Sequence, residues 1–217
     1  MRSVTYVLYY SPGAASFAVH WMLIELGVEF RAKCLDLAAG DQRSPTYLQL
    51  NPAGRVPTLM VDGRAFTESA ALLMLLAEHH PAAKLSPAIG SPLRDRWLET
   101  MVYQSNSLSS AMRDWFYAEK ESEPSGALAV KLLALKRIEG IWDRFDALLG
   151  DGRQYLLGDR VTTADFLATM LMRWSRNMPR PASGWHHIAP YVTRMRARPG
   201  FLEVCRREGL VDWLNES

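Results

Sequence analysis

In the stretch Val56-Pro57-Thr58-Leu59-Met60-Val61-Asp62-Gly63-Arg64-Ala65-Phe66-Thr67, an apolar run meets a tight turn and a second, shorter run. The first run, residues 56–61, is mostly apolar and includes β-branched residues, a pattern that predicts a strand. The pair Asp62-Gly63 is favoured in two-residue turns between antiparallel strands. We therefore expect a hairpin whose short returning strand covers residues 64–67.

The segments on either side of this hairpin indicate the sheet that it joins. Upstream, strand-like residues 4–10 and 29–35 flank a helical pattern over residues 14–26, with Gly27 as its C-terminal cap. Because a helix separates these two strands, we expect them to be parallel. Downstream, residues 68–79 form an apolar helix. The order βαβ followed by ββα predicts a small mixed sheet of four strands.

Strand patterns stop near Ser91, and the rest of the chain is predicted to be helical. The expected helices cover residues 93–119 (interrupted at most by a serine cluster at 105–110), 125–149, 163–174, 188–198 and 200–207. We expect an α/β domain over residues 1–82, a proline-containing linker over 83–92 and an all-helical domain over 93–217.

Composition excludes several classes of protein. The chain has 217 residues, of which 48% are hydrophobic, and 25 Lys and Arg against 23 Asp and Glu give a net charge of +2. These values are ordinary for a globular protein, and they give no electrostatic case for binding nucleic acid. The longest apolar run, residues 70–77, is too short to span a membrane, and no signal peptide is recognised. We expect a cytoplasmic protein with neither nucleic acid nor membrane as a partner.

Cysteine and histidine patterns predict no metal site. Cys34 and Cys205 lie far apart, and we expect both to be buried, reduced thiols. The adjacent pairs His79-His80 and His186-His187 are not expected to place both rings on one helical face. Most of the five histidines, of which the fifth is His20, are expected at the surface.

The start of one later helix is clearly marked in the sequence. Thr162 is a favourable N-cap residue, and Asp165 follows three positions later, as in a capping box with Asp in place of Glu. Val161 and Phe166 are placed to form a hydrophobic staple around it. This pattern concerns folding and not chemistry.

Standard catalytic motifs such as GxSxG, HExxH and the P-loop are missing from the sequence. A loop of small residues, 10–16, instead leads into the first helix. A helix N-terminus exposes backbone N–H groups and a partial positive charge, which stabilise a thiolate or another small anion. An ordinary N-cap serine in a tight turn would give the same local pattern.

Two further segments are suited to hold a small peptide. A proline at a strand entrance can take the cis form and leave the backbone of Val56 free to pair with an extended ligand. Glu68-Ser69 offers a carboxylate, a hydroxyl and the N–H groups of another helix start. Together with the loop at residues 10–16, these groups predict a peptide site with its reactive atom at the first helix.

With these segments the chain resembles the cytosolic glutathione S-transferases, and most of all the bacterial beta-class group. The motifs that carry this resemblance are Tyr9-Tyr10-Ser11-Pro12-Gly13-Ala14, the segments 51–59 and 67–70, Thr162-Thr163-Ala164-Asp165, and the segment from Ile188 to Pro199. They follow the family's order and spacing over nearly the whole chain. The resemblance implies a thioredoxin-like N-terminal domain, an all-α C-terminal domain and a homodimer.

The resemblance also implies roles for individual residues. Val56 would pair with the cysteinyl backbone of glutathione, with Pro57 cis; Glu68 and Ser69 would bind the γ-glutamyl end, and Arg55 is a weaker candidate for a contact. The second substrate would lie between the first helix and the long helix of the second domain. Its candidate lining residues are Tyr103, Asn106, Ser107, Met112, Trp115, Phe116 and Trp174. For any single aromatic among them a core position is favoured, but as a set they fit an apolar pocket between the domains.

The chain departs from the beta-class pattern at two positions. Relatives typically carry a cysteine where this chain has Ala15, and often a histidine where it has Asn106. These changes argue against disulfide-reductase chemistry through an enzyme thiol. They leave the hydroxyls of Ser11 and Ser16 as candidates to stabilise the glutathione thiolate, and the sequence does not distinguish between them.

The predicted function is conjugation of glutathione, as co-substrate and without a metal, to small hydrophobic electrophiles in a detoxification or catabolic role. Alternatives of the same fold are a non-catalytic protein that binds glutathione or hydrophobic ligands, a glutathione-dependent isomerase or dehalogenase, and a protein that keeps only the fold. Binding of glutathione and turnover of electrophiles distinguish these alternatives.

Overall fold

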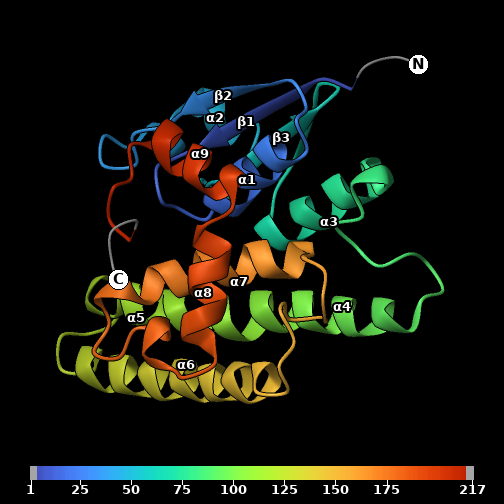
Figure 1. Cartoon of the computed structure of the whole chain (residues 1–217). Helices are drawn as coiled ribbons and strands as arrows, with labels where there is room; N and C mark the ends of the chain where they lie inside the picture. Colours follow the sequence, from blue (N-terminus) through green and yellow to red (C-terminus); the bar gives the residue numbers. More distant parts are fainter. Residues whose placement is uncertain (1–3, 214–217) are drawn as a thin grey trace. The chain divides into compact units, whose positions relative to one another are not determined.

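The computed structural model describes residues 4–213, and its first unit is built on a four-stranded sheet (Figure 1). The strands are β1 (Tyr6–Tyr10), β2 (Phe30–Cys34), β3 (Thr58–Val61) and β4 (Arg64–Phe66), in the order β2-β1-β3-β4. β1 and β2 are parallel, whereas β1 with β3 and β3 with β4 are antiparallel. The predicted mixed sheet is thereby confirmed, and its strand directions are those of a thioredoxin-like domain.

Helices cover this sheet and connect its strands. They are α1 (Phe17–Glu25), α2 (Pro45–Leu48), α3 (Ser69–His79) and α9 (Pro199–Glu208), with short 3₁₀ turns at Asp41–Arg43 and Pro81–Ala83. Leu26 is the C-cap residue of α1. Gly27 follows it with φ of 63°, the left-handed conformation expected of a glycine at a helix C-terminus.

The last helix, α9, packs against the first, α1. The ring centroid of Phe201 lies 5.6 Å from that of Phe17 and 5.1 Å from that of Trp21. Gly200 permits this close approach, because a Cβ atom there would collide with Glu25 and Trp21. An aromatic cluster therefore ties the two helices together.

The chain divides into two compact units, Met1–Ser86 with Arg196–Ser217, and Pro87–Met195. The sequence pattern placed everything after residue 92 in one helical domain. The final helix instead belongs with the sheet, because its apolar face is buried against α1.

The second unit is entirely helical. Its helices are α4 (Pro92–Tyr103), a π-helical segment (Gln104–Ser109), α5 (Ser110–Glu121), α6 (Ala127–Leu149), α7 (Thr163–Trp174) and α8 (Ile188–Arg196), with 3₁₀ turns at Ser175–Asn177 and Ala182–Gly184. The long helix predicted over residues 93–119 is thus interrupted at its serine cluster, where the hydrogen-bond pattern widens to a π-helix.

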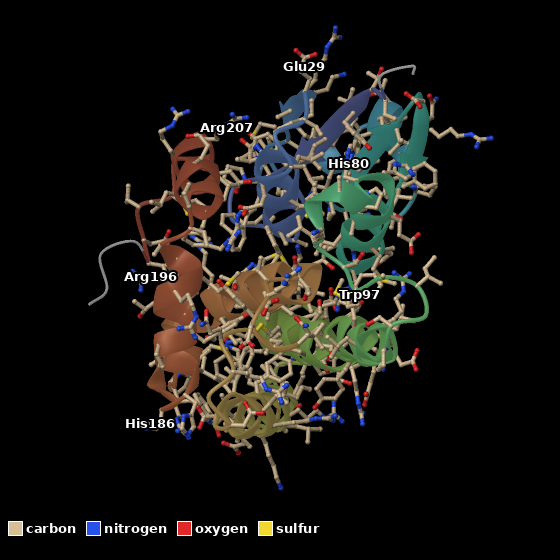
Figure 2. The ribbon with its side chains drawn as sticks, turned by 45° about the vertical axis from the view of Figure 1, so that its right-hand side comes forward. Glu29, His80, Trp97, His186, Arg196 and Arg207 are labelled. Atoms are coloured by element: carbon tan, nitrogen blue, oxygen red, sulfur yellow. The ribbon has the colours of Figure 1, made fainter. Side chains whose placement is uncertain are left out.

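α7 forms the centre of the helical unit. Every residue from Thr163 to Arg173 is buried. The indole N–H of Trp97, labelled in Figure 2, donates to Thr163 Oγ1 over 2.9 Å. The amide of Gln104 donates to the carbonyl oxygen of Ala164 over 3.1 Å. Two side chains from the α4 region therefore bond the first turn of α7.

The predicted capping box at α7 is confirmed. The N–H of Thr162 donates to Asp165 Oδ2 over 2.7 Å, the N–H of Leu156 donates to Oδ1 over 2.9 Å, and the hydroxyl of Tyr191 donates to Oδ1 over 3.0 Å. Burial raises the pKa of the Asp165 carboxyl, while these donors lower it. Burial, with the nearby Asp165 charge, raises the pKa of Tyr191 well above its usual value of 10.0.

The expectation of two buried cysteines is wrong for one of them. Cys34 is exposed, because β2 is an edge strand of the sheet, whereas Cys205 is buried. His20 is only 1% exposed and is the exception among the histidines, most of which are at least partly exposed as expected. Within residues 4–213, no three His, Cys, Asp or Glu side chains are grouped to hold a metal ion. No helix in this described part of the chain is long and apolar enough to cross a membrane.

The adjacent histidines His79 and His80 at the end of α3 contact the same side chain. His79 Nδ1 and His80 Nε2 lie 3.3 Å and 2.9 Å from the hydroxyl oxygen of Tyr6, so both rings reach one group. Burial, and to a lesser extent His79, lowers the pKa of His80. The helix ends at this pair, where the backbone of His80 leaves the helical conformation and lets the second ring turn back.

Candidate functional site: open backbone groups at one edge of the sheet

The loop between β1 and α1 leaves backbone donors unpaired. α1 begins at Phe17, three residues later than the sequence pattern predicted. The N–H groups of Ala15 and Ser16 have no hydrogen-bond partner among the described residues. Together with the positive end of the helix dipole, these donors form an environment that favours an anion.

The two candidate serines of this loop have different surroundings. Ser16 is 0% exposed, and its hydroxyl donates to the carbonyl oxygen of Ser11 and accepts from the N–H of Ser11, each over 3.2 Å. The hydroxyl of Ser11, whose residue is 8% exposed, has no partner within residues 4–213. Ser16 therefore holds the loop closed, and Ser11 has the unengaged hydroxyl.

A carboxylate from α9 anchors the same loop. Glu208 Oε2 accepts the N–H of Gly13 over 2.7 Å, and Glu208 Oε1 lies 2.8 Å from His20 Nδ1. The side chains of Glu208 and His20 are 0% and 1% exposed. This pair is not apparent in the sequence, where only the apolar pattern of α9 indicates that this helix packs against another element.

The N-terminus of α3 lies beside the loop. Glu68, the N-cap residue, has φ of 69° and makes no side-chain cap. The first bond to a preceding carbonyl is from the N–H of Leu72 to Glu68, and the N–H groups of Ser69 and Ala70 have no partner within residues 4–213. The hydroxyl of Ser69 donates to the carbonyl oxygen of Ala15 over 2.7 Å. Two helix starts with free donors are therefore joined by one hydrogen bond.

Val56 supplies a third set of open groups. The peptide bond between Val56 and Pro57 is cis, as the resemblance implied. Neither the N–H nor the C=O of Val56 is hydrogen-bonded within the described chain. Tyr9 pairs with Thr58 in the antiparallel register of β1 and β3, and continuing this register by two residues places Val56 opposite Ser11. The open strand backbone and the loop thus lie at the same edge.

These groups define what the site can bind. An extended peptide can pair with the backbone of Val56, while one of its carboxylates accepts from the N–H groups of α3. A thiol carried by that peptide then lies near α1, where the open donors stabilise its ionised form. The side chain of Arg55 is exposed and is free to meet a second carboxylate.

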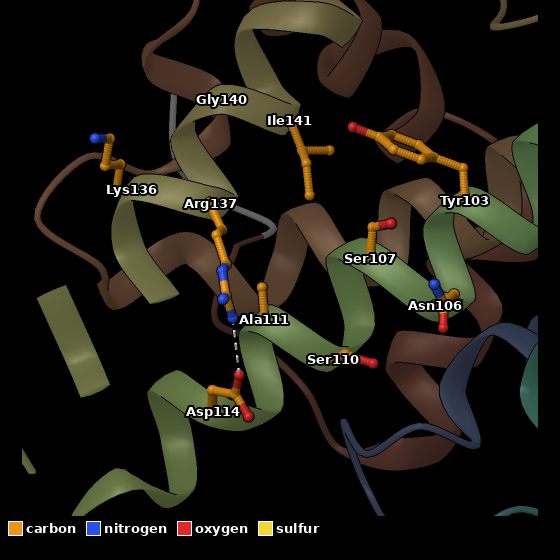
Figure 3. Close-up of a pocket in the computed structure, with 10 residues that line it drawn as sticks. All are labelled: Tyr103, Asn106, Ser107, Ser110, Ala111, Asp114, Lys136, Arg137, Gly140 and Ile141. Carbon is orange, nitrogen blue, oxygen red and sulfur yellow. Dashed lines mark ion pairs between the residues drawn. The ribbon is translucent and has the colours of Figure 1, made fainter. Parts of the chain in front are cut away.

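In the helical unit, three of the seven candidate electrophile contacts line one cavity. Tyr103, Asn106 and Ser107 face a cavity of about 430 Å³ between the π-helical segment, α5 and α6 (Figure 3). The other residues that line it are Ser110, Ala111, Asp114, Lys136, Arg137, Gly140 and Ile141. Asp114 and Arg137 form an ion pair there at 3.7 Å. This charged lining does not match the mostly apolar pocket that the sequence predicts.

The other four candidates do not line that cavity. Met112 is fully buried, and the ring of Trp115 lies under Lys131 Nζ at 5.6 Å. Phe116 and Trp174 form an edge-to-face pair with ring centroids 6.4 Å apart. Phe116 is 49% exposed, so this pair is accessible from solvent. The proposed electrophile contacts are therefore not gathered in one place within the helical unit.

A thioredoxin-like unit with open helix starts, together with an all-helical unit, defines a two-domain class of glutathione-dependent enzymes. Family models for the N-terminal and the C-terminal domain of glutathione S-transferases match residues 14–79 and 114–199. The chain belongs to the glutathione S-transferase family, which is a family of transferase enzymes.

Individual members of the family are similar over nearly the full chain. Glutathione S-transferase GST-4.5 of Xanthomonas campestris is 30% identical over 207 residues, covering 94% of this chain and 98% of that protein. A sphingomonad glutathione S-transferase, solved in complex with glutathione, is 29% identical with a TM-score of 0.82, covering 94% and 99%. A beta-class enzyme of Sphingomonas chungbukensis is 29% identical with a TM-score of 0.83, covering 94% and 100%.

Proposed function

We propose that the protein conjugates the thiolate of glutathione to small hydrophobic electrophiles. The observation that carries this proposal is the set of open backbone groups at Val56, at Ser69-Ala70 and at Ala15-Ser16, all in the sheet unit. Their arrangement suits a tripeptide with a carboxylate at one end and a thiol in the middle. The related sphingomonad enzyme that was solved with glutathione supports the same ligand.

Each group has a distinct role in this proposal. The backbone of Val56, held by the turn at Pro57, pairs with the cysteinyl residue. The N–H groups and hydroxyl of Ser69 bind the γ-glutamyl carboxylate, and the exposed carboxylate of Glu68 binds its ammonium group. Arg55 contacts the tripeptide through its guanidinium.

The hydroxyl of Ser11 donates to the thiolate, and the N–H groups of Ala15 and Ser16 add to its stabilisation. Ser16 acts indirectly, because its own hydroxyl already bonds the backbone of Ser11. Catalysis then rests on a lowered thiol pKa and on proximity to the electrophile.

Conjugation of an aryl halide tests this assignment. The wild-type protein should consume the aryl halide in a glutathione-dependent reaction, and Ser11→Ala should lower kcat/KM by about tenfold, the equivalent of one unit of thiol pKa. Ser16→Ala should instead lower the unfolding midpoint, because Ser11 loses two backbone contacts. Unchanged kinetics in Ser11→Ala would refute the role of its hydroxyl.

Binding and turnover assays on the wild-type protein also distinguish the alternative functions. Calorimetric binding of glutathione without turnover of any electrophile in a broad panel would favour a ligand-binding protein. A protein that does not bind glutathione at millimolar concentration would share only the fold of the family. Turnover of a halide by substitution or of a double bond by isomerisation would identify the more specialised reactions.

The second substrate is proposed to contact the helical unit at Phe116 and Trp174. Their edge-to-face pair offers an accessible aromatic surface, which suits a planar apolar electrophile. Phe116→Ala should raise KM for the aryl halide and leave KM for glutathione unchanged. Tyr117→Phe, at an exposed neighbour, serves as the control.

A homodimer in the cytoplasm is also proposed. Six apolar side chains on α4 and α6 are exposed to solvent: Leu93, Leu98, Val102, Leu128, Leu132 and Leu133. Surfaces of this kind are often covered by a partner chain. Light scattering coupled to gel filtration should give twice the chain mass. Cys34 and Cys205 are not joined in a disulfide, which is in keeping with a reducing compartment.

A further inference from the structure

A buried polar cluster lies directly behind the segment that is proposed to bind glutathione. It consists of the side chains of Tyr47, Asn51 and Thr58 and the carbonyl group of Arg55. The three side chains belong to residues that are 3%, 4% and 0% exposed. Arg55 immediately precedes Val56, and Thr58 immediately follows Pro57, so the cluster holds both ends of that dipeptide.

The members of this cluster are hydrogen-bonded to one another. The carbonyl oxygen of Arg55 accepts from the hydroxyl of Tyr47 over 2.6 Å and from the amide of Asn51 over 2.7 Å. Thr58 Oγ1 lies 2.8 Å from the hydroxyl of Tyr47 and 3.2 Å from the amide nitrogen of Asn51. If Thr58 donates to Tyr47, the two hydroxyl protons and the two amide protons each have an acceptor.

Tyr47 is well placed to act as a fixed donor. It lies on α2, whose N-cap Ser44 accepts the N–H of Tyr47 over 3.4 Å. Its ring centroid lies 5.5 Å from that of Tyr9 on β1. Burial raises the pKa of Tyr47, and its bonds to Thr58 and Asn51 lower it less, so the hydroxyl keeps its proton at neutral pH.

We propose that the hydroxyl of Tyr47 is a positioning element for glutathione, an inference that rests on the proposed function. By holding the carbonyl of Arg55 and the hydroxyl of Thr58, it fixes the orientation of the intervening backbone. The N–H and C=O of Val56 then point out of the sheet edge in the geometry that pairs with the cysteinyl residue. Tyr47 acts on the affinity for glutathione, and the thiolate chemistry at Ser11 stays independent of it.

Tyr47→Phe tests the proposal, because it removes the hydroxyl and keeps the ring. One hydrogen bond of this kind corresponds to a change of about five- to tenfold in affinity. We expect Kd and KM for glutathione to rise by that factor, with kcat at saturating glutathione within about twofold of the wild type. A defect that merely unfolds part of the protein would lower kcat in proportion to the folded fraction and leave KM unchanged.

Tyr9→Phe is the matched control. Its hydroxyl lies on the same sheet, accepts only from the exposed Lys33 at 3.2 Å, and its ring packs against Tyr47. The same chemical change should leave the affinity for glutathione at the wild-type value. An equal loss in both variants would refute a specific role for Tyr47.

Two substitutions at Thr58 test the same hydrogen bonds independently if Tyr47→Phe folds poorly. Thr58→Val removes the hydroxyl and should weaken glutathione binding in the same way, whereas Thr58→Ser restores it and should bind as the wild type does. Wild-type affinity in folded Tyr47→Phe or in Thr58→Val overturns the proposal and leaves the proposed function intact. A wild-type protein that does not bind glutathione overturns both.

Discussion

Helices α1 and α7 both begin at buried residues, but the backbone N–H groups of the residues that precede them have different surroundings. Asp165, the third residue of α7, accepts the N–H of Thr162 over 2.7 Å and that of Leu156 over 2.9 Å. At α1, the N–H groups of Ala15 and Ser16 have no partner in the described chain. One helix start is closed by its own sequence, and the other is left open.

The difference follows from what each helix does. α7 is the centre of the helical unit, and an unpaired N–H group there would cost the full desolvation of a buried donor. α1 begins at the edge of the sheet, where a ligand can supply the missing acceptor. A carboxylate that closes the segment before a helix therefore marks a folding element, and donors left open beside small residues mark a binding element.

Removing the α7 cap should produce the largest effect. Asp165→Ala removes the carboxylate that accepts from four buried donors: the N–H of Leu156, the N–H and the hydroxyl of Thr162, and the hydroxyl of Tyr191. We expect the free energy of unfolding to fall by about 3–5 kcal/mol. Urea denaturation followed by circular dichroism measures this loss.

An exposed aspartate provides the control for that substitution. Asp151 binds Arg153, and these hydrogen bonds lower its pKa to about 2, yet it is exposed to solvent. Asp151→Ala should not change the urea midpoint measurably. If Asp165→Ala behaved like Asp151→Ala, the capping box would contribute nothing to the fold.

The open helix start has its own anchor, and breaking it should have the second-largest effect. Glu208→Ala removes the carboxylate that bonds the N–H of Gly13 and Nδ1 of His20. We expect a loss of about 2–3 kcal/mol in unfolding free energy and a higher KM for glutathione, because the loop before α1 is no longer held.

Glu203→Ala on the same helix is the matched control. Glu203 is on the solvent side of α9 and pairs with Arg206 at 2.7 Å and Arg207 at 2.7 Å. Its loss should leave both stability and KM unchanged. A normal KM in a destabilised Glu208→Ala would show that Glu208 supports the fold but not the site.

These two anchors also show what could be predicted from the sequence. The capping box was predictable because Thr162 and Asp165 are three residues apart, and α7 has the predicted bounds 163–174. Glu208 was not, because it meets Gly13 and His20 from 195 and 188 residues away. Local patterns identify local bonds, whereas a distant partner requires the fold itself.

The same argument applies to the sheet and to the loop. The four strands were predicted within about two residues, since each has a local pattern. The exposure of Cys34 was missed because the sequence does not show that β2 is an edge strand. The different surroundings of Ser11 and Ser16 were also hidden, because they depend on which hydroxyl turns back onto the backbone.

The smallest test concerns Tyr191, which donates to Asp165 in the closed helix start. Burial raises the pKa of Tyr191 well above its usual 10.0. The folded protein therefore keeps this proton at a pH where the unfolded chain loses it. The contribution of Tyr191 is fully present below the unfolded pKa and is lost as pH rises toward the folded pKa, which amounts to about 0.8 kcal/mol by about pH 10.5.

Tyr191→Phe should remove this alkaline loss. Buried Tyr6, Tyr47 and the partly buried Tyr10 also have raised pKa values, but they contribute equally to both proteins and cancel in the comparison. The variant starts less stable at neutral pH, because Asp165 loses a donor, and its stability then falls less steeply between about pH 9 and about pH 10.5. Urea midpoints across this range measure the slope. An identical slope in Tyr191→Phe would mean that the pKa of Tyr191 is no higher in the folded protein than in the unfolded chain.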